Sequence, residues 1–515
     1  MEPPQERSLG LEILLFVVLA LVVRGYKGFV TPIIAEDGVV YIEQADLLRE
    51  GKVRESLTGH YPPLYPAAIA VFGGIFSDPV TAGKAVSILF GAIAVVPLIL
   101  LGRTLLPARA VRGAAVVYVL APFLLTLSGD VLSESLFLFL VLGSVAGIWI
   151  GAGEGKLIPI ALAGVAAGLS TLTRPEGILL APFGLIAIPS LRVRSQRIGT
   201  KIAPLAVFLV LALAPLAPYA ALLQSETGHL QFTRKGSELL GGLPRYAARK
   251  GVALEGYRGL GGEEGISVGE AVTVIGRNRG LFLEKYVHDF ALLVVQAFPH
   301  AIHPVALGLF LSGLLLRPPS GRKEWLLIFF LVWYVACIAV NYPNPRFLAA
   351  MIPPACLWCG IGLDEIARRL ERRFANRSHR IWWTLLVIFA AGLGARAFQR
   401  ERVDKLWMKA AAQAIGVESG SSRICARSRR VAFYANGEHL PWPTGTNAGA
   451  LFQYCRERRA THLVVRKEPR NAWFFKGERP ASLREAHSSE AVVVYALPAT
   501  DGISPNPDGA TGSGH

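Results

Sequence analysis

The stretch LIPIALAGVAAGLSTLTRPEGILLAPFGLIAIPS (residues 157–190) consists of two apolar segments with almost no loop between them. A helix needs about 20 apolar residues to cross the hydrocarbon core of a bilayer. We therefore expect two neighbouring membrane-spanning helices, at 157–173 and 176–190. The short junction carries Arg174 and Glu176, two charged residues at the boundary of the membrane.

Apolar segments of this kind recur along the chain. Of its 515 residues, 52% are hydrophobic and 17% are charged, less than the usual quarter for a soluble domain. We predict a polytopic all-α membrane protein with these eleven spans: 9–25, 80–101, 112–128, 132–150, 157–173, 176–190, 202–222, 299–316, 324–341, 347–363 and 381–398. The segment 62–76 is apolar but short and opens with prolines, so we expect a re-entrant or juxtamembrane helix there.

Positive charge falls in alternate loops between these spans. The loops on one side hold 17 Lys and Arg residues, whereas the short loops on the other side hold only Arg174 and Arg346. Because basic loops face the cytoplasm, the N-terminus is predicted inside and the C-terminal region outside. The same bias accounts for the net charge of +16, so we expect no nucleic-acid partner. The first segment, 9–25, lacks a cleavage site and is expected to stay as a span.

The predicted domains follow from this topology. They are a membrane domain at 1–398 with external loops 26–79 and 223–298, a small external α/β domain at 399–498, and a disordered tail at 499–515. The segment 281–298 is typical of a helix lying on the membrane surface.

The α/β prediction rests on alternating patterns in the C-terminal region. We expect strands at 431–437, 461–467 and 491–497, and helices at 404–415 and 446–458. Cys425 and Cys455 lie in this domain, and the sequence leaves open whether they pair.

Acidic and aromatic residues follow the first predicted span. Glu36 and Asp37 open the stretch EDGVVYIEQADLLRE (36–50), and Tyr41 lies four residues after Asp37, on the same face of a helix. Taken alone, these acids are most often the solvated face of a helix. His60 and Tyr61 follow in GHYPPLYP (59–66), where prolines restrict the backbone.

Further charged residues are expected at the same membrane face. Glu134 lies in LSGDVLSESLF (127–137), and an acid at membrane depth is costly and usually functional. Arg174 and Arg346 each adjoin a proline, and Arg is suited to clamping phosphate oxygens. His300 and His303 are weak metal candidates, three residues apart on one expected helix face.

The motifs occur in a recognisable order. An acid four residues before Tyr41 is followed by YPPLYP (61–66), GRTLL (102–106), LSES (132–135), TRPEG (173–177) and PRFL (345–348). Across about residues 9–363, this order resembles the GT-C glycosyltransferases, and within them the protein O-mannosyltransferases and the lipid A aminoarabinose transferases.

The resemblance implies an enzyme that takes a sugar from a polyprenyl-phosphate donor and transfers it with inversion to a lipid, protein or glycan acceptor. It places Asp37 as the catalytic base, with Glu36 as the alternative, and Glu134 as the acid of the second external loop. The implied substrate-binding residues are Glu36, Tyr41, His60, Tyr61, Arg174, Glu176 and Arg346. No cofactor is required, although a divalent metal is possible.

The short loops and compact external regions are typical of a bacterial protein, so we expect a bacterial inner membrane, and the basic loops predict an active site on the periplasmic or external face. We expect Asp37, Glu134, Arg174 and Arg346 to converge there. Two alternatives are a secondary transporter and a receptor or scaffold acting through its C-terminal domain. Transporters usually show repeated halves with binding groups near the bilayer midplane, and no such repeat is found.

Overall fold

The structure is a computed structural model. It describes residues 4–192, 199–228, 231, 233–234, 240, 242–257, 268–374, 378–416, 422–443, 447–476 and 483–497. The chain forms two compact units, and each is described separately. The first unit combines Met1–Thr31 with Val40–Arg400, and the second combines Pro32–Val39 with Glu401–His515.

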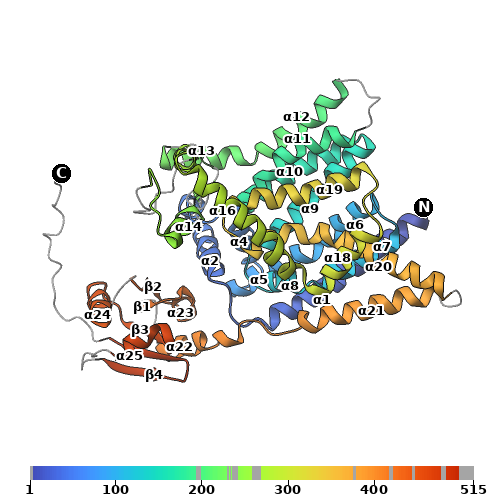
Figure 1. Ribbon diagram of the computed structural model, residues 1–515. Helices are drawn as coiled ribbons and strands as arrows, with labels where there is room; N and C mark the ends of the chain where they lie inside the picture. Colours follow the sequence, from blue (N-terminus) through green and yellow to red (C-terminus); the bar gives the residue numbers. More distant parts are fainter. Residues whose placement is uncertain are drawn as a thin grey trace. The chain divides into compact units, whose positions relative to one another are not determined.

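Helices build the first unit (Figure 1). Its first half contains α1 (Pro4–Phe29), α2 (Glu36–Arg49, whose first turn belongs to the second unit), α3 (Val53–Leu57), α4 (Leu64–Phe72), α5 (Pro79–Ile93), α6 (Val95–Arg103), α7 (Ala108–Leu120), α8 (Pro122–Ser128), α9 (Glu134–Glu154) and α10 (Leu157–Thr173). Its second half contains η1 (Pro175–Leu179), α11 (Leu180–Leu191), α12 (Gly199–Leu213), α13 (Leu216–Thr227), α14 (Leu243–Lys250), α15 (Val268–Arg277), α16 (Arg279–Leu292), the π-helix η3 (Leu293–Ala297), α17 (Phe298–Ile302), α18 (Pro304–Leu316), α19 (Arg322–Ile338), η4 (Pro345–Met351), α20 (Ile352–Arg373) and α21 (Ser378–Ala397).

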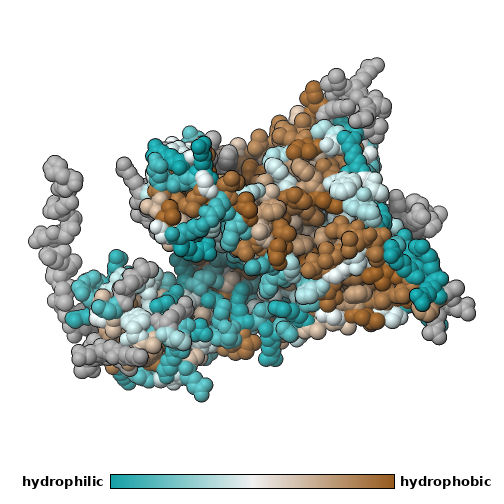
Figure 2. Space-filling view, in the orientation of Figure 1, coloured by the Kyte–Doolittle hydropathy of each residue, from teal (hydrophilic) through white to brown (hydrophobic). Residues whose placement is uncertain are grey.

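These helices confirm a polytopic membrane fold. Among the described residues, five helices are long and apolar enough to cross a membrane, or eight if each bent pair is one span. The predicted spans fall on helices or bent pairs, and the short α4 occupies the segment expected not to cross. Hydrophobic side chains also cover the outward faces of α18 and α19 (Figure 2). Those exposed there include Leu311, Leu315, Trp325, Phe329 and Val332.

The sequence predicts a surface helix at 281–298 and a span at 299–316, but the structure places the boundary between the two helical segments five residues later than 298, at His303. The helical run Arg279–Ile302 meets Pro304–Leu316 at an angle of 112°. The break lies at His303, whose φ of 74° is incompatible with continuing a right-handed helix.

Close packing of α20 against its neighbours depends on small residues. The α-carbon of Gly360 on α20 lies against the backbone of Ala110 on α7. A β-carbon at this position would clash with the carbonyl oxygen of Ala110, a backbone atom that cannot rotate away. The approach of the two helices is therefore fixed by the absence of a side chain.

We expect Gly360→Ala to destabilise the protein by about 1–3 kcal/mol, the usual cost of overpacking a core. The measurement is the melting temperature in detergent. Gly143→Ala on α9 is the matched control, because a β-carbon there meets nothing within 4 Å. Equal melting temperatures for the two variants would contradict the close approach.

The second unit contains a five-stranded sheet of order β2-β1-β3-β5-β4. The strands are β1 (Arg423–Ala426), β2 (Glu438–Pro441), β3 (His462–Arg466), β4 (Arg484–Ser488) and β5 (Val492–Ala496). The helices are η6 (Val403–Lys405), α22 (Trp407–Ile415), α23 (Arg429–Tyr434), α24 (Ala448–Glu457), η7 (Pro469–Asn471) and α25 (Ala472–Lys476). β1 pairs in parallel with both β2 and β3, whereas β5 pairs antiparallel with β3 and β4.

Each face of this sheet carries its own apolar core. Ile424 of β1 and Val464 of β3 pack with α22 and α23 on one face. Cys425, which follows Ile424, and Leu463, which precedes Val464, pack with α24 and α25 on the other face of the sheet. The alternation follows the two-residue period of a strand and produces a three-layer α/β arrangement.

The structure corrects one predicted strand. Residues 431–437 begin within helix α23 rather than a strand, because Val431, Ala432 and Ala435 are all buried in the same core, a helical spacing. The expected strands at 461–467 and 491–497 are present as β3 and β5, and the two expected helices are present as α22 and α24. The prediction missed β1, β2 and β4, each of four or five residues.

Cys425 and Cys455 are both free and fully buried in the same core. The neighbouring Cys455 thiol and burial together raise the pKa of Cys425. Both side chains therefore act as small apolar groups in this structure.

Candidate functional site

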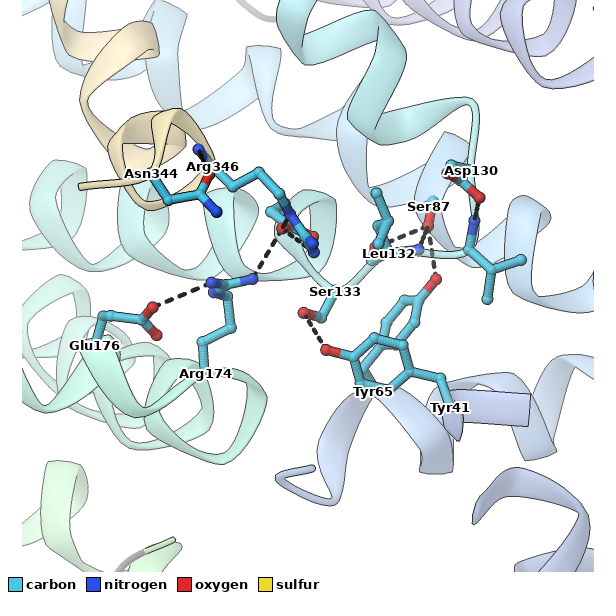
Figure 3. Close-up of polar contacts among 12 residues, drawn as sticks. Tyr41, Tyr65, Ser87, Asp130, Leu132, Ser133, Arg174, Glu176, Asn344 and Arg346 are labelled. Atoms are coloured by element: carbon cyan, nitrogen blue, oxygen red, sulfur yellow. Dashed lines mark hydrogen bonds and ion pairs between the residues drawn. The ribbon is translucent and has the colours of Figure 1, made fainter. Parts of the chain in front are cut away.

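A buried ion cluster joins three of the sequence candidates (Figure 3). Glu134 lies in the first turn of α9, Arg174 directly follows α10, and Arg346 lies in η4. Oε1 of Glu134 is 2.9 Å from Nη1 of Arg174 and 2.6 Å from Nη2 of Arg346. Nη2 of Arg174 also contacts Oε1 of Glu176 at 3.1 Å. Residues separated by more than 200 positions thus form one charged centre.

Two prolines set the backbone at this cluster. Arg174 precedes Pro175 and is extended, with φ −148° and ψ 139°, because a residue before proline avoids the helical region. Asn344 precedes Pro345 and is extended in the same way. Its Oδ1 accepts a hydrogen bond from the backbone N–H of Arg346 at 3.0 Å. Pro175 therefore ends α10 at Arg174, and Pro345 starts η4 after Asn344. Both arginines then reach Glu134.

Burial differs across the cluster. The side chain of Glu134 is 1% exposed and that of Arg174 is 12% exposed, whereas Arg346 is 30% exposed. Arg174 also lies over the rings of Phe137 and Phe347, which fix its plane. A carboxylate between two guanidinium groups is strongly held in its charged form and is a poor proton acceptor. Glu134 is thus suited to orienting the arginines, and Arg346 is the member most open to a ligand.

A tyrosine cluster packs beside this centre. The Tyr41 hydroxyl is 2.9 Å from the Ser133 hydroxyl, one residue before Glu134. The Tyr41 ring centroid lies 4.4 Å from that of Tyr61 and 4.8 Å from that of Tyr65. Tyr41 and Tyr61 are buried, so the structure places these expected substrate-binding residues in a supporting layer behind the ion cluster.

Sequence reasoning did not single out several members of this layer. Tyr65 forms a hydrogen bond of 2.7 Å with Ser87, and Ser87 donates to the carbonyl of Leu132 at 3.0 Å. Nε2 of Gln44 donates hydrogen bonds to the backbone carbonyls of Ser56 at 3.0 Å and Tyr61 at 3.2 Å. The repeated tyrosine of YPPLYP was a signal for Tyr65, but Ser87 and Gln44 lie in ordinary helical sequence.

Three other candidates have different surroundings. Glu36 accepts hydrogen bonds from the backbone N–H of Arg429 at 2.7 Å and from the Ser428 hydroxyl at 2.9 Å, and it pairs with Arg430 at 3.0 Å, all within the second unit. Asp37 follows it and is partly buried. His60 is exposed, and its ring meets Tyr61 edge-on at 4.8 Å.

The predicted histidine pair is wrong in its geometry. His300 is in α17, but His303 lies beyond the end of that helix, so the two do not share a helix face. Nδ1 of His303 accepts a hydrogen bond from the backbone N–H of Val305 at the start of α18. Within the described part of the chain, no group of three or more His, Cys, Asp or Glu residues could hold a metal ion.

Comparisons with known proteins agree with this architecture. The family model for dolichyl-phosphate-mannose-protein mannosyltransferase matches residues 60–220. No curated protein matches the chain by sequence.

Solved structures resemble most of the chain. The crystal structure of ArnT from Cupriavidus metallidurans bound to undecaprenyl phosphate has a TM-score of 0.57 at 13% identity, covering 94% of this chain and 97% of ArnT. The oligosaccharyltransferase of Archaeoglobus fulgidus in its apo form has a TM-score of 0.56 at 13% identity, covering 88% of this chain and 69% of its own. The complex of AglB from the same organism with an inhibitory peptide and a dolichol-phosphate has a TM-score of 0.54 at 13% identity, with the same coverage. The chain therefore shares the GT-C fold of these membrane proteins.

Proposed function

We propose that this chain is an inverting glycosyltransferase that moves a sugar from a polyprenyl-phosphate donor to a lipid, protein or glycan acceptor at the outer face of the membrane. The observation that carries the proposal is the buried cluster of Glu134, Arg174 and Arg346. The fold supports it, because solved structures of the same fold contain undecaprenyl phosphate or a dolichol-phosphate. The family match over residues 60–220 points to the same donor class.

The arginines serve the leaving group in this proposal. As the bond between the anomeric carbon and the phosphate oxygen breaks, negative charge grows on the phosphate, and fixed cations stabilise it. Arg346, the more exposed of the two, contacts the phosphate, while Arg174 and Glu134 keep its guanidinium oriented. Because guanidinium groups supply the positive charge, the proposal requires no metal or other cofactor.

Asp37 acts as the general base in this proposal. It removes a proton from the acceptor as the acceptor attacks the anomeric carbon from the side opposite the phosphate, which inverts that carbon. Asp37 is assigned this role by its position in the order of motifs, four residues before Tyr41. Glu134 is held by two arginines, which suits it to orienting them rather than to accepting a proton.

The distribution of basic loops supports an external site. Arg174 and Arg346 lie in short loops with few positive charges, and we assign the alternate, basic loops to the cytoplasmic side. We place the protein in a bacterial inner membrane, with its active site facing the periplasm or the exterior.

A labelled-donor assay tests the proposed function. Purified protein in membrane extract is given a radiolabelled undecaprenyl-phosphate sugar in one sample and the matching nucleotide sugar in another. We expect label in a product only from the lipid donor, with the anomeric configuration inverted. Transfer from the nucleotide sugar alone, or a product of retained configuration, would contradict the proposal.

A further inference from the structure

The second unit contains a cavity of about 490 Å³, a size typical of small-molecule sites. It lies at the carboxyl ends of the parallel strands β1 and β3. Its lining includes Ala426 and Arg466, the last residues of the two strands, and Arg427 and Glu468, which follow them. The chain leaves β1 for α23 on one face of the sheet and leaves β3 for α25 on the other. Open α/β sheets bind ligands at such a switch point, where the two connections diverge.

Positive charge dominates the lining. Its cations are Lys405, Arg427, Arg430 and Arg466, and its anions are Glu36 and Glu468. Arg430 pairs with Glu36 at 3.0 Å, and Arg466 pairs with Glu468 at 3.3 Å. Among the residues that the structure describes, Lys405 and Arg427 form no ion pair, so two cations remain unbalanced. The cavity is therefore set up for an anionic group.

Lys405 is itself surrounded by an excess of positive charge. Burial lowers the pKa of Lys405, and the nearby guanidinium groups of Arg430 and Arg402 lower it further, against the opposing effect of Asp404. A cation whose pKa is lowered by other cations gains from an added negative charge.

Aromatic rings and unpaired polar atoms complete the lining. Arg427 lies over the ring of Trp442 at 4.9 Å, and Arg466 lies over Trp407 at 5.5 Å. The indole Nε1 of each tryptophan is buried and has no hydrogen-bond partner in the described part of the chain. Asn471 is fully buried, and its Nδ2 donates to the carbonyl of Arg466 at 2.8 Å. Its Oδ1, by contrast, has no partner among the described residues.

We propose that this cavity is a binding site for an anionic saccharide, a sugar that carries a phosphate or a carboxylate. Lys405 and Arg427 bind the charged group, because charge-assisted hydrogen bonds to guanidinium and ammonium groups are the strong ones. The two indole N–H donors and the Asn471 acceptor bind hydroxyl groups, which can both accept and donate. The site shares no residue with the ion cluster at Glu134 and does not depend on the proposed transferase activity.

Calorimetric titration of the full-length protein in detergent tests the proposal. The probes are glucose 1-phosphate, glucuronic acid, glucose and inorganic phosphate. We expect at least one of the two acidic sugars to bind at least tenfold more tightly than both glucose and phosphate, and the stronger one shows whether phosphate or carboxylate is preferred. Arg427→Ala and Lys405→Ala each weaken that binding at least tenfold, whereas Arg484→Ala, an exposed arginine on β4, does not.

Three results would overturn the proposal. The first is an absence of binding by both acidic sugars. The second is inorganic phosphate binding as tightly as the better acidic sugar, which would exclude recognition of the saccharide. The third is unchanged affinity in Arg427→Ala and Lys405→Ala, which would place the binding elsewhere. Arg427 is exposed, so its replacement by alanine is compatible with folding.

Discussion

Replacing Asp37 with asparagine is expected to lower the rate of sugar transfer by at least about 100-fold, the usual contribution of a positioned general base. Asparagine keeps the size of the side chain but cannot accept the acceptor's proton. The measurement is the initial rate of label transfer from the lipid-phosphate donor by the purified variant. Donor binding should persist, because the phosphate is held by arginine in the proposed mechanism.

Glu43→Gln is the control for this substitution. Glu43 is an exposed residue of the same helix, α2, and its loss of charge should leave the rate unchanged. If Asp37→Asn transfers sugar at the parental rate, Asp37 is not the base. If both variants lose activity equally, the effect comes from the charge of the helix rather than from proton transfer.

Replacing Arg174 with glutamine is expected to destabilise the protein by about 3–5 kcal/mol, the cost of breaking a buried ion pair. The substitution leaves Glu134 almost fully buried, with Arg346 as its one remaining cation among the described residues. It also removes the partner of Glu176. The melting temperature in detergent should fall accordingly.

A second substitution separates charge imbalance from general damage. The double variant Arg174→Gln with Glu134→Gln removes both charges, so it should lose less stability than the two single variants added together. Sugar transfer should stay low in all three variants, because in the proposed mechanism Arg174 and Glu134 orient the guanidinium of Arg346, which contacts the donor phosphate. Strict additivity of the stability losses would argue against direct coupling between the two side chains.

The surface pair Arg54 and Glu226 provides a matched comparison. Its charges are 2.5 Å apart, but the Arg54 side chain is 73% exposed. Exposed pairs contribute only about 0–1 kcal/mol, so Arg54→Gln should hardly change the melting temperature. If Arg54→Gln lowers the melting temperature as much as Arg174→Gln does, burial does not set the cost of breaking these ion pairs.

The sequence predicted most of the helical unit because the signal is local. Long apolar segments report the hydrophobic requirement of the bilayer directly, and they matched helices or bent helix pairs. The small α/β domain was harder to predict from the sequence. The strand β1 has only four residues. Val431, Phe433 and Tyr434 are typical of strands in composition, but the buried residues Val431, Ala432 and Ala435 follow a helical spacing. Short elements take their conformation from the layers that cover them.

Local motifs also predicted parts of the site. The sequence analysis noted a proline beside each of the two arginines, and the structure showed the consequence: Arg174 and Asn344, the residues before these prolines, are extended. The sequence could list Glu134, Arg174 and Arg346 as candidates at one membrane face. It could not show that a single carboxylate oxygen lies within 3 Å of both guanidinium groups.

By itself, the sequence determined the class of fold, the apolar helices and the residue types available for chemistry, because each of these depends on neighbours along the chain. Tertiary structure decided which charges meet: it paired Glu134 with two distant arginines and engaged Glu36 with Arg430. Ion pairs act over a few ångströms in space, whatever the separation in sequence. The engagement of Glu36 by Arg430, almost 400 positions away in sequence, could therefore be seen only once the chain has folded.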